Sequence, residues 1–248
     1  MPAVINVLDP NHPKRVLMIA PNAAVSPTTG WPIGCWIAEI THPWLAFTDR
    51  GYHVDIASPD GGDLLIDGYS DPRHESGYSA HDIVSLGFLT SPTHSALLLN
   101  TKKVADVNLN EYDAIFLVGG QSPMVTYRGN AHVQNVVRTA WESGKVVALV
   151  CHAVCTLLET TLSDGSLLVH GKTWTGFSDA EEAYADAYVG QRIQPFWIES
   201  EARKIESTNF ITGGLFKPFA VRDGRLVTGQ QQYSGAAAAD LVIQALGM

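Results

Sequence analysis

The sequence predicts an α/β protein built around a mostly parallel β-sheet that helices cover on both faces. Short apolar runs rich in β-branched residues alternate with stretches whose apolar residues recur at helical spacing, which is typical of βα units. A late pair of strand-like runs is joined by Asp223-Gly224, and this dipeptide suits a two-residue hairpin turn. The 248 residues, 46% of them hydrophobic and 17% charged, are enough to bury a substantial core.

The first half of the chain contains three expected strands and one long helix. The strands are expected at residues 15–20, 53–58 and 114–118, and the helix at 34–50. Gly51 is a typical stop signal for that helix, and Gly119-Gly120 ends the third strand.

The second half continues the alternation and closes with the hairpin and a helix. We expect a helix at 130–144, a strand at 146–150, a helix at 153–160, an extended segment at 172–177, a helix at 179–188, the hairpin at 219–228 and a helix at 234–246. The absence of repeats and linkers predicts a single domain over residues 1–248, with 60–110 as a candidate inserted subregion.

Composition excludes several classes of function. The net charge of −9 argues against a nucleic-acid partner, because such proteins carry a basic surface. No signal peptide and no apolar run of about 20 residues is visible, so we expect neither export nor a membrane partner. Cys35, Cys151 and Cys155 form neither a disulfide framework nor a set of metal ligands, which favours a cytoplasmic protein without a metal site.

The most informative stretch is the strand at 146–150 that runs directly into Cys151. A side chain at such a strand-to-helix turn lies exposed at the carboxyl edge of the sheet, where open α/β folds bind ligands. The N–H groups at the start of the following helix lower the pKa of a thiol, so an activated nucleophile is expected. The alternative is a buried structural cysteine, which is the interpretation we favour for Cys155, one helical turn later; Cys35 is open between the two.

His152 follows the nucleophile and can act as an acid or base near neutral pH. Such a role requires a carboxylate that orients the ring. Asp179, Glu181 and Glu182 offer three, although acids at the start of a helix also stabilise an ordinary helix terminus.

Six motifs occur in an order that resembles a known superfamily. They are Gly34-Cys-Trp-Ile-Ala-Glu39 with His42-Pro43, the segment 51–62, Val118-Gly-Gly120, Val150-Cys-His152, the segment 175–182 and the segment 223–229. Over about residues 15–246 the chain resembles the DJ-1/PfpI superfamily, which has a class I glutamine amidotransferase-like fold. Within it, the similarity is to the branch of Hsp31-like chaperones and glutathione-independent (type III) glyoxalases.

This resemblance implies a flavodoxin-like three-layer sandwich with a nucleophile elbow, a homodimer and a site without a cofactor. By position, Cys151 matches the nucleophile, His152 its partner base and Glu182 the acid that orients His152, with Glu181 as the alternative. The N–H groups of Gly120 and His152 match an oxyanion hole.

Glu39 matches a carboxyl group that hydrogen-bonds the cysteine sulfur. We expect it to stay protonated, because two adjacent anions are unfavourable.

The chain departs from the glyoxalase branch at two places near the site. That branch usually shows Gly-Gly-His-Gly, where this chain has Gly-Gly-Gln121-Ser, and Ala153 replaces a glycine. Trp31, Trp36 and Tyr127 also make the neighbourhood more aromatic than methylglyoxal needs. Gly120, Gln121 and Trp36 are the expected substrate-binding residues.

The leading hypothesis is therefore cofactor-free conversion of a small carbonyl compound, a 2-oxoaldehyde, into a 2-hydroxy acid. A hydratase or lyase acting on a larger substrate is the nearest alternative, and Gln121 favours it. A glutamine amidotransferase is disfavoured, because His170 is the only histidine after His152. A holdase chaperone or oxidation sensor, with Cys151 as a switch, is the alternative from another class.

Overall fold

The computed structural model describes residues 13–247, and its centre is a seven-stranded sheet in the order β10-β11-β7-β6-β1-β4-β5. Its strands are β1 (Arg15–Ile19), β4 (His53–Ser58), β5 (Lys102–Lys103), β6 (Ala114–Leu117), β7 (Val146–Val150), β10 (Ala220–Asp223) and β11 (Leu226–Gly229). All neighbouring pairs are parallel except the hairpin β10–β11. This confirms the predicted α/β fold and its late antiparallel hairpin.

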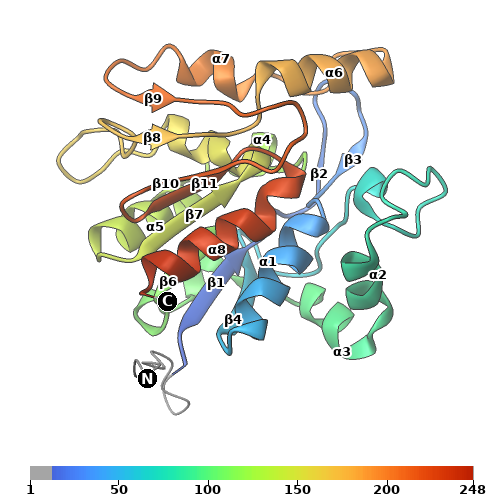
Figure 1. Ribbon diagram of the computed structural model, residues 1–248, viewed down its shortest axis with the longest axis horizontal. Coiled ribbons are helices and arrows are strands. Elements are labelled where there is room, and N and C mark those ends of the chain that lie inside the picture. The colour runs from blue at the N-terminus through green and yellow to red at the C-terminus, as the bar shows by residue number, and fades with distance from the viewer. Residues whose placement is uncertain (1–12, 248) are drawn as a thin grey trace, which may run out of the picture.

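Helices cover both faces of the sheet (Figure 1). The longer ones are α1 (Ala38–Asp49), α2 (Ile83–Thr90), α5 (Ala131–Glu142), α6 (Asp179–Val189) and α8 (Gly235–Ala245). The connection from β1 to β4 runs toward one edge of the sheet, and the connection from β6 to β7 runs toward the other. Because both crossovers are right-handed, their helices α1 and α5 lie on opposite faces of the sheet. With α8 packed beside α1, the result is the flavodoxin-like three-layer arrangement.

Shorter elements connect the longer ones. They are β2 (Ala24–Val25) with β3 (Pro32–Ile33), β8 (Thr173–Trp174) with β9 (Asn209–Phe210), the helices α3 (Pro92–Ser95), α4 (Pro123–Thr126) and α7 (Ile198–Ala202), and the 3₁₀ helices η1 (Gly68–Ser70), η2 (Ala96–Leu98), η3 (Val104–Asp106), η4 (Leu109–Glu111), η5 (Cys151–Leu158) and η6 (Gln232–Ser234).

The central strands form the core because both of their faces are covered. Every residue of β6 and β7 is buried, as expected of parallel strands between two helical layers. Residues 60–110 contribute β5 to one edge of this sheet and place α2 against α1. Within residues 13–247, no helix is long and apolar enough to cross a membrane.

Three predicted elements differ from the structure. The helix expected from residue 34 begins at Ala38, because Gly34 and Cys35 instead donate their N–H groups to Asp67 and Leu65. The extended segment at 172–177 is reduced to β8, whose partner β9 lies outside the main sheet. The helix expected at 153–160 is η5, which begins at Cys151 itself.

Candidate active site

Cys151 lies at a sharp turn between β7 and η5, at the carboxyl edge of the sheet. Its φ of 56° falls in the left-handed region, which a non-glycine residue adopts only at a cost in backbone strain. Gly119 and Gly120 make the turn sterically possible: a Cβ on Gly119 would lie 2.9 Å from that of Cys151, and one on Gly120 would lie 2.5 Å from the Trp36 nitrogen. The predicted elbow is therefore present, although the thiol is 3% exposed.

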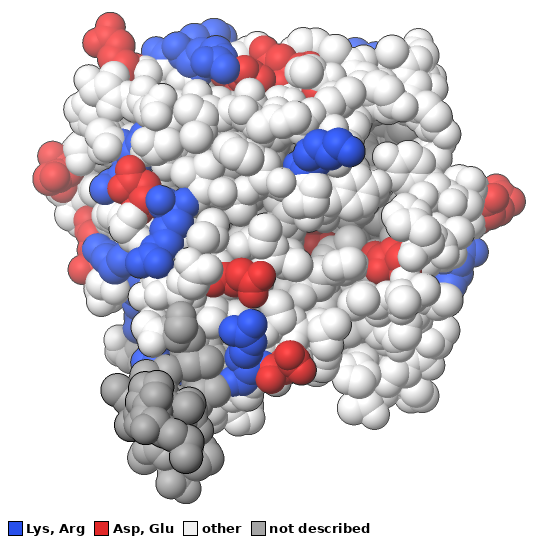
Figure 2. Space-filling view, viewed as in Figure 1, with Lys and Arg blue, Asp and Glu red and all other residues white. Residues whose placement is uncertain are grey.

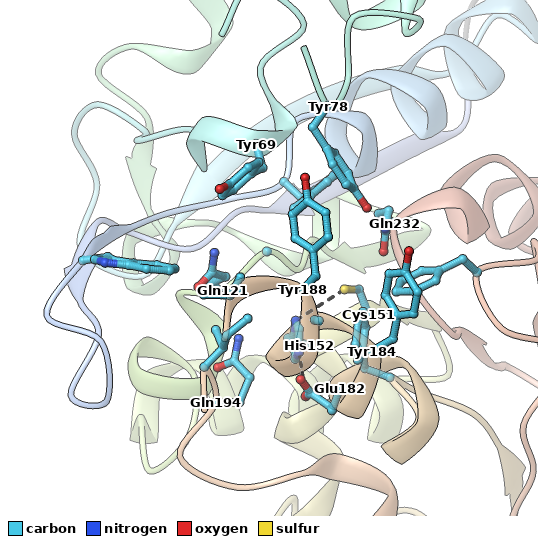
Figure 3. Close-up of a pocket in the computed structure, with 18 residues that line it drawn as sticks. Tyr69, Tyr78, Gln121, Cys151, His152, Glu182, Tyr184, Tyr188, Gln194 and Gln232 are labelled. Carbon is cyan, nitrogen blue, oxygen red and sulfur yellow. Dashed lines mark hydrogen bonds and ion pairs between the residues drawn. The ribbon is translucent and has the colours of Figure 1, made fainter. Parts of the chain in front are cut away.

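The side chains of Cys151, His152 and Glu182 form a continuous chain of contacts (Figure 3). The Cys151 Sγ lies 3.5 Å from His152 Nδ1, and His152 Nε2 lies 3.0 Å from Glu182 Oε1. With its proton on Nε2, donated to Glu182, the imidazole presents the Nδ1 lone pair to the thiol. Phe177 stacks on the imidazole at 4.3 Å and restricts its rotation.

Glu182, and not its neighbour Glu181, contacts His152. Glu181 instead closes a capping box with Ser178 and accepts hydrogen bonds from the Phe216 N–H and the Gln230 amide. Burial raises the pKa of Glu182, while the neighbouring His152 lowers it.

Glu39 lies behind the thiol and is fully buried. Its Oε2 accepts the Gly119 N–H at 2.8 Å, and its Oε1 has no hydrogen-bond partner of normal geometry among the described residues. Burial raises the pKa of Glu39 from its ordinary 4.5 to about 8, and contacts with the Cys151 thiol and the Gly119 N–H partly offset that rise. The expectation that this carboxyl is protonated at neutral pH agrees with that direction.

The thiol pKa differs from the sequence-based expectation. Burial and the adjacent Glu39 raise the pKa of Cys151 well above its ordinary value, whereas the N–H groups of His152 and Gly120 lower it by less. The expected activation of the thiol rests on those N–H groups, and its burial outweighs them. Ionisation of either group opposes ionisation of the other, so the titrations of the thiol and of Glu39 are coupled.

Asp67 is a buried carboxyl that the sequence argument missed. Its two oxygens accept the N–H groups of Gly34 and Gln121, both at 2.8 Å. Burial raises its pKa to about 6, while these two N–H groups and His152 lower it. Asp67 thereby fixes the residue that follows Gly120, and no pattern in the sequence around residue 67 indicates this long-range contact.

A pocket that is partly open to solvent leads to Cys151 and His152. Figure 2 shows a hollow in the face seen in Figure 1, bordered mainly by uncharged side chains. Eight of the eighteen lining residues are aromatic, and Trp36, Gly120 and Gln121 are among the eighteen, as expected. In Figure 3, Tyr69, Tyr78 and Tyr188 lie above Gln121 and His152.

The match to known proteins covers most of the chain. The model of the DJ-1/PfpI family matches residues 37–244. This chain belongs to the DJ-1/PfpI family. Glyoxalase 3 of Candida albicans is 28% identical to it over 87% of this chain and 91% of that protein. Glutathione-independent glyoxalase HSP31 of Saccharomyces cerevisiae is 26% identical, over 94% and 98% of the two chains.

Solved structures agree with this assignment. The crystal structure of Candida albicans glyoxalase III superposes with a TM-score of 0.75 at 28% identity, over 94% of this chain and 98% of that one. The Rapid Encystment Protein 24 KDa of Francisella tularensis gives a TM-score of 0.84 at 26% identity, over 95% and 100%. The resemblance to the Hsp31-like and glyoxalase branch of the DJ-1/PfpI family is thus confirmed.

Three other candidate residues of this DJ-1/PfpI chain lie in its core and do not line the pocket. Tyr127, which the sequence argument grouped with the pocket, is fully buried and donates its hydroxyl to the Ile19 carbonyl at 2.8 Å. The thiols of Cys35 and Cys155 are buried and donate to the carbonyls of Leu65 and Pro123. In the described part of the chain, no group of three His, Cys, Asp or Glu side chains could hold a metal ion.

Proposed function

We propose that this chain is a glutathione-independent glyoxalase that converts a 2-oxoaldehyde into a 2-hydroxy acid with Cys151 as the nucleophile. The observation that carries the proposal is the contact chain from Sγ through His152 to Glu182 at the floor of a pocket. Relatives with glyoxalase names, similar over most of the chain, support the same reaction.

The first step is attack of the Cys151 thiolate on the aldehyde carbon, which forms a C–S bond and an oxyanion. The N–H groups of Gly120 and His152 face the sulfur and are placed to stabilise that oxyanion. His152 Nδ1, which lies 3.5 Å from the sulfur, takes the thiol proton and passes it to the oxyanion, which becomes a hydroxyl group. Glu39 stays protonated beside the sulfur.

The second step moves a proton between the two carbons. His152 Nδ1 takes the proton from the former aldehyde carbon and returns it to the neighbouring carbon, which leaves a thioester on Cys151. His152 lines the pocket whereas Glu39 lies behind the sulfur, so His152 is the better placed base.

Water then hydrolyses the thioester and releases the 2-hydroxy acid. One carbon is oxidised while its neighbour is reduced, so the reaction as proposed needs no external oxidant, metal or nicotinamide.

The direct test is lactate formation from methylglyoxal with no glutathione, metal or nicotinamide added. Cys151→Ala should abolish lactate, whereas Cys155→Ala, which removes a thiol outside the pocket, should retain it. Turnover that survives Cys151→Ala would contradict the covalent mechanism. No turnover by wild type across 2-oxoaldehydes would favour the hydratase alternative, for which the neutral Gln121 in the pocket is the supporting observation.

We also propose that residues 1–248 form a single domain that works as a cytoplasmic homodimer without nucleic acid. The net charge of −9 and the three free, buried cysteines support the compartment and the absence of a nucleic-acid partner. Light scattering after gel filtration tests the dimer.

A further inference from the structure

The walls of the pocket are more aromatic than a three-carbon substrate requires. Six rings, those of Trp31, Trp36, Tyr69, Tyr78, Tyr184 and Tyr188, surround the approach to Cys151. Methylglyoxal bound to Cys151 would leave most of these rings without contact.

The rings at the mouth have faces free for a ligand. Tyr78 is the centre of an edge-to-face cluster, with its centroid 6.0 Å from Trp36, 5.8 Å from Tyr69 and 6.3 Å from Tyr188. Tyr184 and Tyr188 are nevertheless 52% and 63% exposed, although both line the pocket. Aromatic side chains gain most by packing against another ring, so an aromatic ligand would complete this cluster.

The polar groups of the pocket favour an uncharged ligand. Among the described residues, no Lys or Arg lines it, and its polar side chains beyond the relay and the tyrosines are the amides of Gln121, Gln194 and Gln232. A phosphate or carboxylate on the substrate would be desolvated without a cation, which is costly. Gln121 Oε1 is buried and has no partner in the described part of the chain, so it could accept a hydrogen bond from the hydroxyl group of the adduct that a neutral 2-oxoaldehyde forms on Cys151.

We propose that the site takes an uncharged 2-oxoaldehyde bearing an aromatic ring in preference to a three-carbon 2-oxoaldehyde. The inference rests on the proposed glyoxalase function and names its substrate class. With phenylglyoxal, Cys151 would attack the aldehyde carbon, His152 would move the proton to the benzylic carbon, and water would release mandelate. The atoms balance as for methylglyoxal, with one water consumed. The aryl ring would lie beside Tyr188, in the cluster around Tyr78.

The test compares product formation from phenylglyoxal and methylglyoxal. Mandelate and lactate are quantified by chromatography, because phenylglyoxal also reacts with arginine side chains and its disappearance is not specific. Wild type should show a kcat/KM about tenfold or more higher for phenylglyoxal. A carboxylate in the para position of the ring should lower that value about tenfold.

Variants separate ring contacts from the intrinsic reactivity of the two aldehydes. Tyr188→Ala should lower the phenylglyoxal-to-methylglyoxal ratio of kcat/KM several-fold, and Tyr188→Phe should keep it. Leu45→Ala, an exposed position on α1 outside the pocket, is the matched control and should keep the ratio. A wild-type ratio of one or less, or an unchanged ratio in Tyr188→Ala, overturns the aromatic class while leaving the glyoxalase function intact. Absence of both products from wild type overturns both proposals.

Discussion

At the scale of single residues, two buried carboxyl groups organise the turn that bears the nucleophile. Glu39 accepts the N–H of Gly119, and Asp67 accepts the N–H of Gln121, so the two acids hold Gly120 from both sides. Burial raises the pKa of each, to about 8 and about 6. The geometry of the proposed oxyanion site therefore depends on groups whose charge changes near physiological pH.

Glu39→Gln tests this charge through stability. A carboxyl whose pKa is 4.5 unfolded and about 8 folded favours the folded state fully below pH 4.5, and this contribution is lost as pH rises to about 8. Glutamine does not titrate and can still accept the Gly119 N–H. In urea unfolding, the free energy of unfolding of the variant relative to that of wild type should rise by about 1 kcal/mol or more between pH 5 and pH 8.5. The exposed Glu75→Gln is the control, and a parallel pH response of the two variants would contradict the assignment.

Asp67→Asn tests positioning. Asparagine can accept one of the two backbone N–H groups, and its amide then faces the other as a second donor. We expect kcat to fall about tenfold with KM within about threefold, since one unpaired buried donor costs about 1–3 kcal/mol. Asp71→Asn, in the same segment but paired with Arg73, should keep both constants. An effect confined to KM would place Asp67 in substrate binding instead.

At the scale of elements, the loop after β6 and the turn after β7 are built against each other. Gly120 has a φ of 104°, and a Cβ there would lie 2.5 Å from the Trp36 nitrogen and 2.6 Å from the Gly34 carbonyl oxygen. The ends of β6 and β7 can thus bring Gly120 and Cys151, the proposed oxyanion donor and nucleophile, together only because residue 120 has no side chain.

Comparison of Gly120→Ala with Gly165→Ala separates the steric cost of a Cβ from the backbone strain of a residue with positive φ. Both residues have positive φ, but a Cβ on Gly165 would meet nothing within 4 Å. Gly165→Ala should therefore cost only the strain of about 1–3 kcal/mol, with turnover kept. Gly120→Ala should unfold at a lower urea concentration than Gly165→Ala and should lose turnover. Equal stability of the two variants would show that the loop can move away from Trp36.

Features that depend on local interactions could be predicted from the sequence, whereas features that depend on contacts between distant residues could not. The strands around Ile115 and Ala148 were predicted because burial on both faces imposes continuous apolar runs. Cys151 and Glu182 could be proposed from the sequence because a strand end and a helix start are local signals. The start of α1, the role of Asp67 and the ring of Tyr78 depend on residues 60–80 folding back over the site. Such long-range contacts leave no periodicity in the sequence.

At the scale of the whole molecule, segments distant in sequence share the same layers. α8, at the end of the chain, packs along α1, and β5 joins the edge of the sheet beside β4. Trp44 on α1 packs edge-to-face against Phe88 of α2, with ring centroids 5.4 Å apart. These contacts couple residues 60–110 to the core and favour one cooperative unit over an inserted subregion that folds separately.

Urea unfolding followed by two probes tests that cooperativity. Far-UV circular dichroism reports all helices, and tryptophan fluorescence includes Trp44 against α2 and Trp174 in the buried core of the other half. Both signals should give one midpoint, because a domain of this kind loses its sheet and its covering helices together. Trp44→Phe keeps a ring against Phe88 while removing that reporter, and its fluorescence and circular dichroism midpoints should also coincide. If wild type instead shows an early fluorescence transition that Trp44→Phe lacks, residues 60–110 unfold independently and the single-domain proposal is wrong.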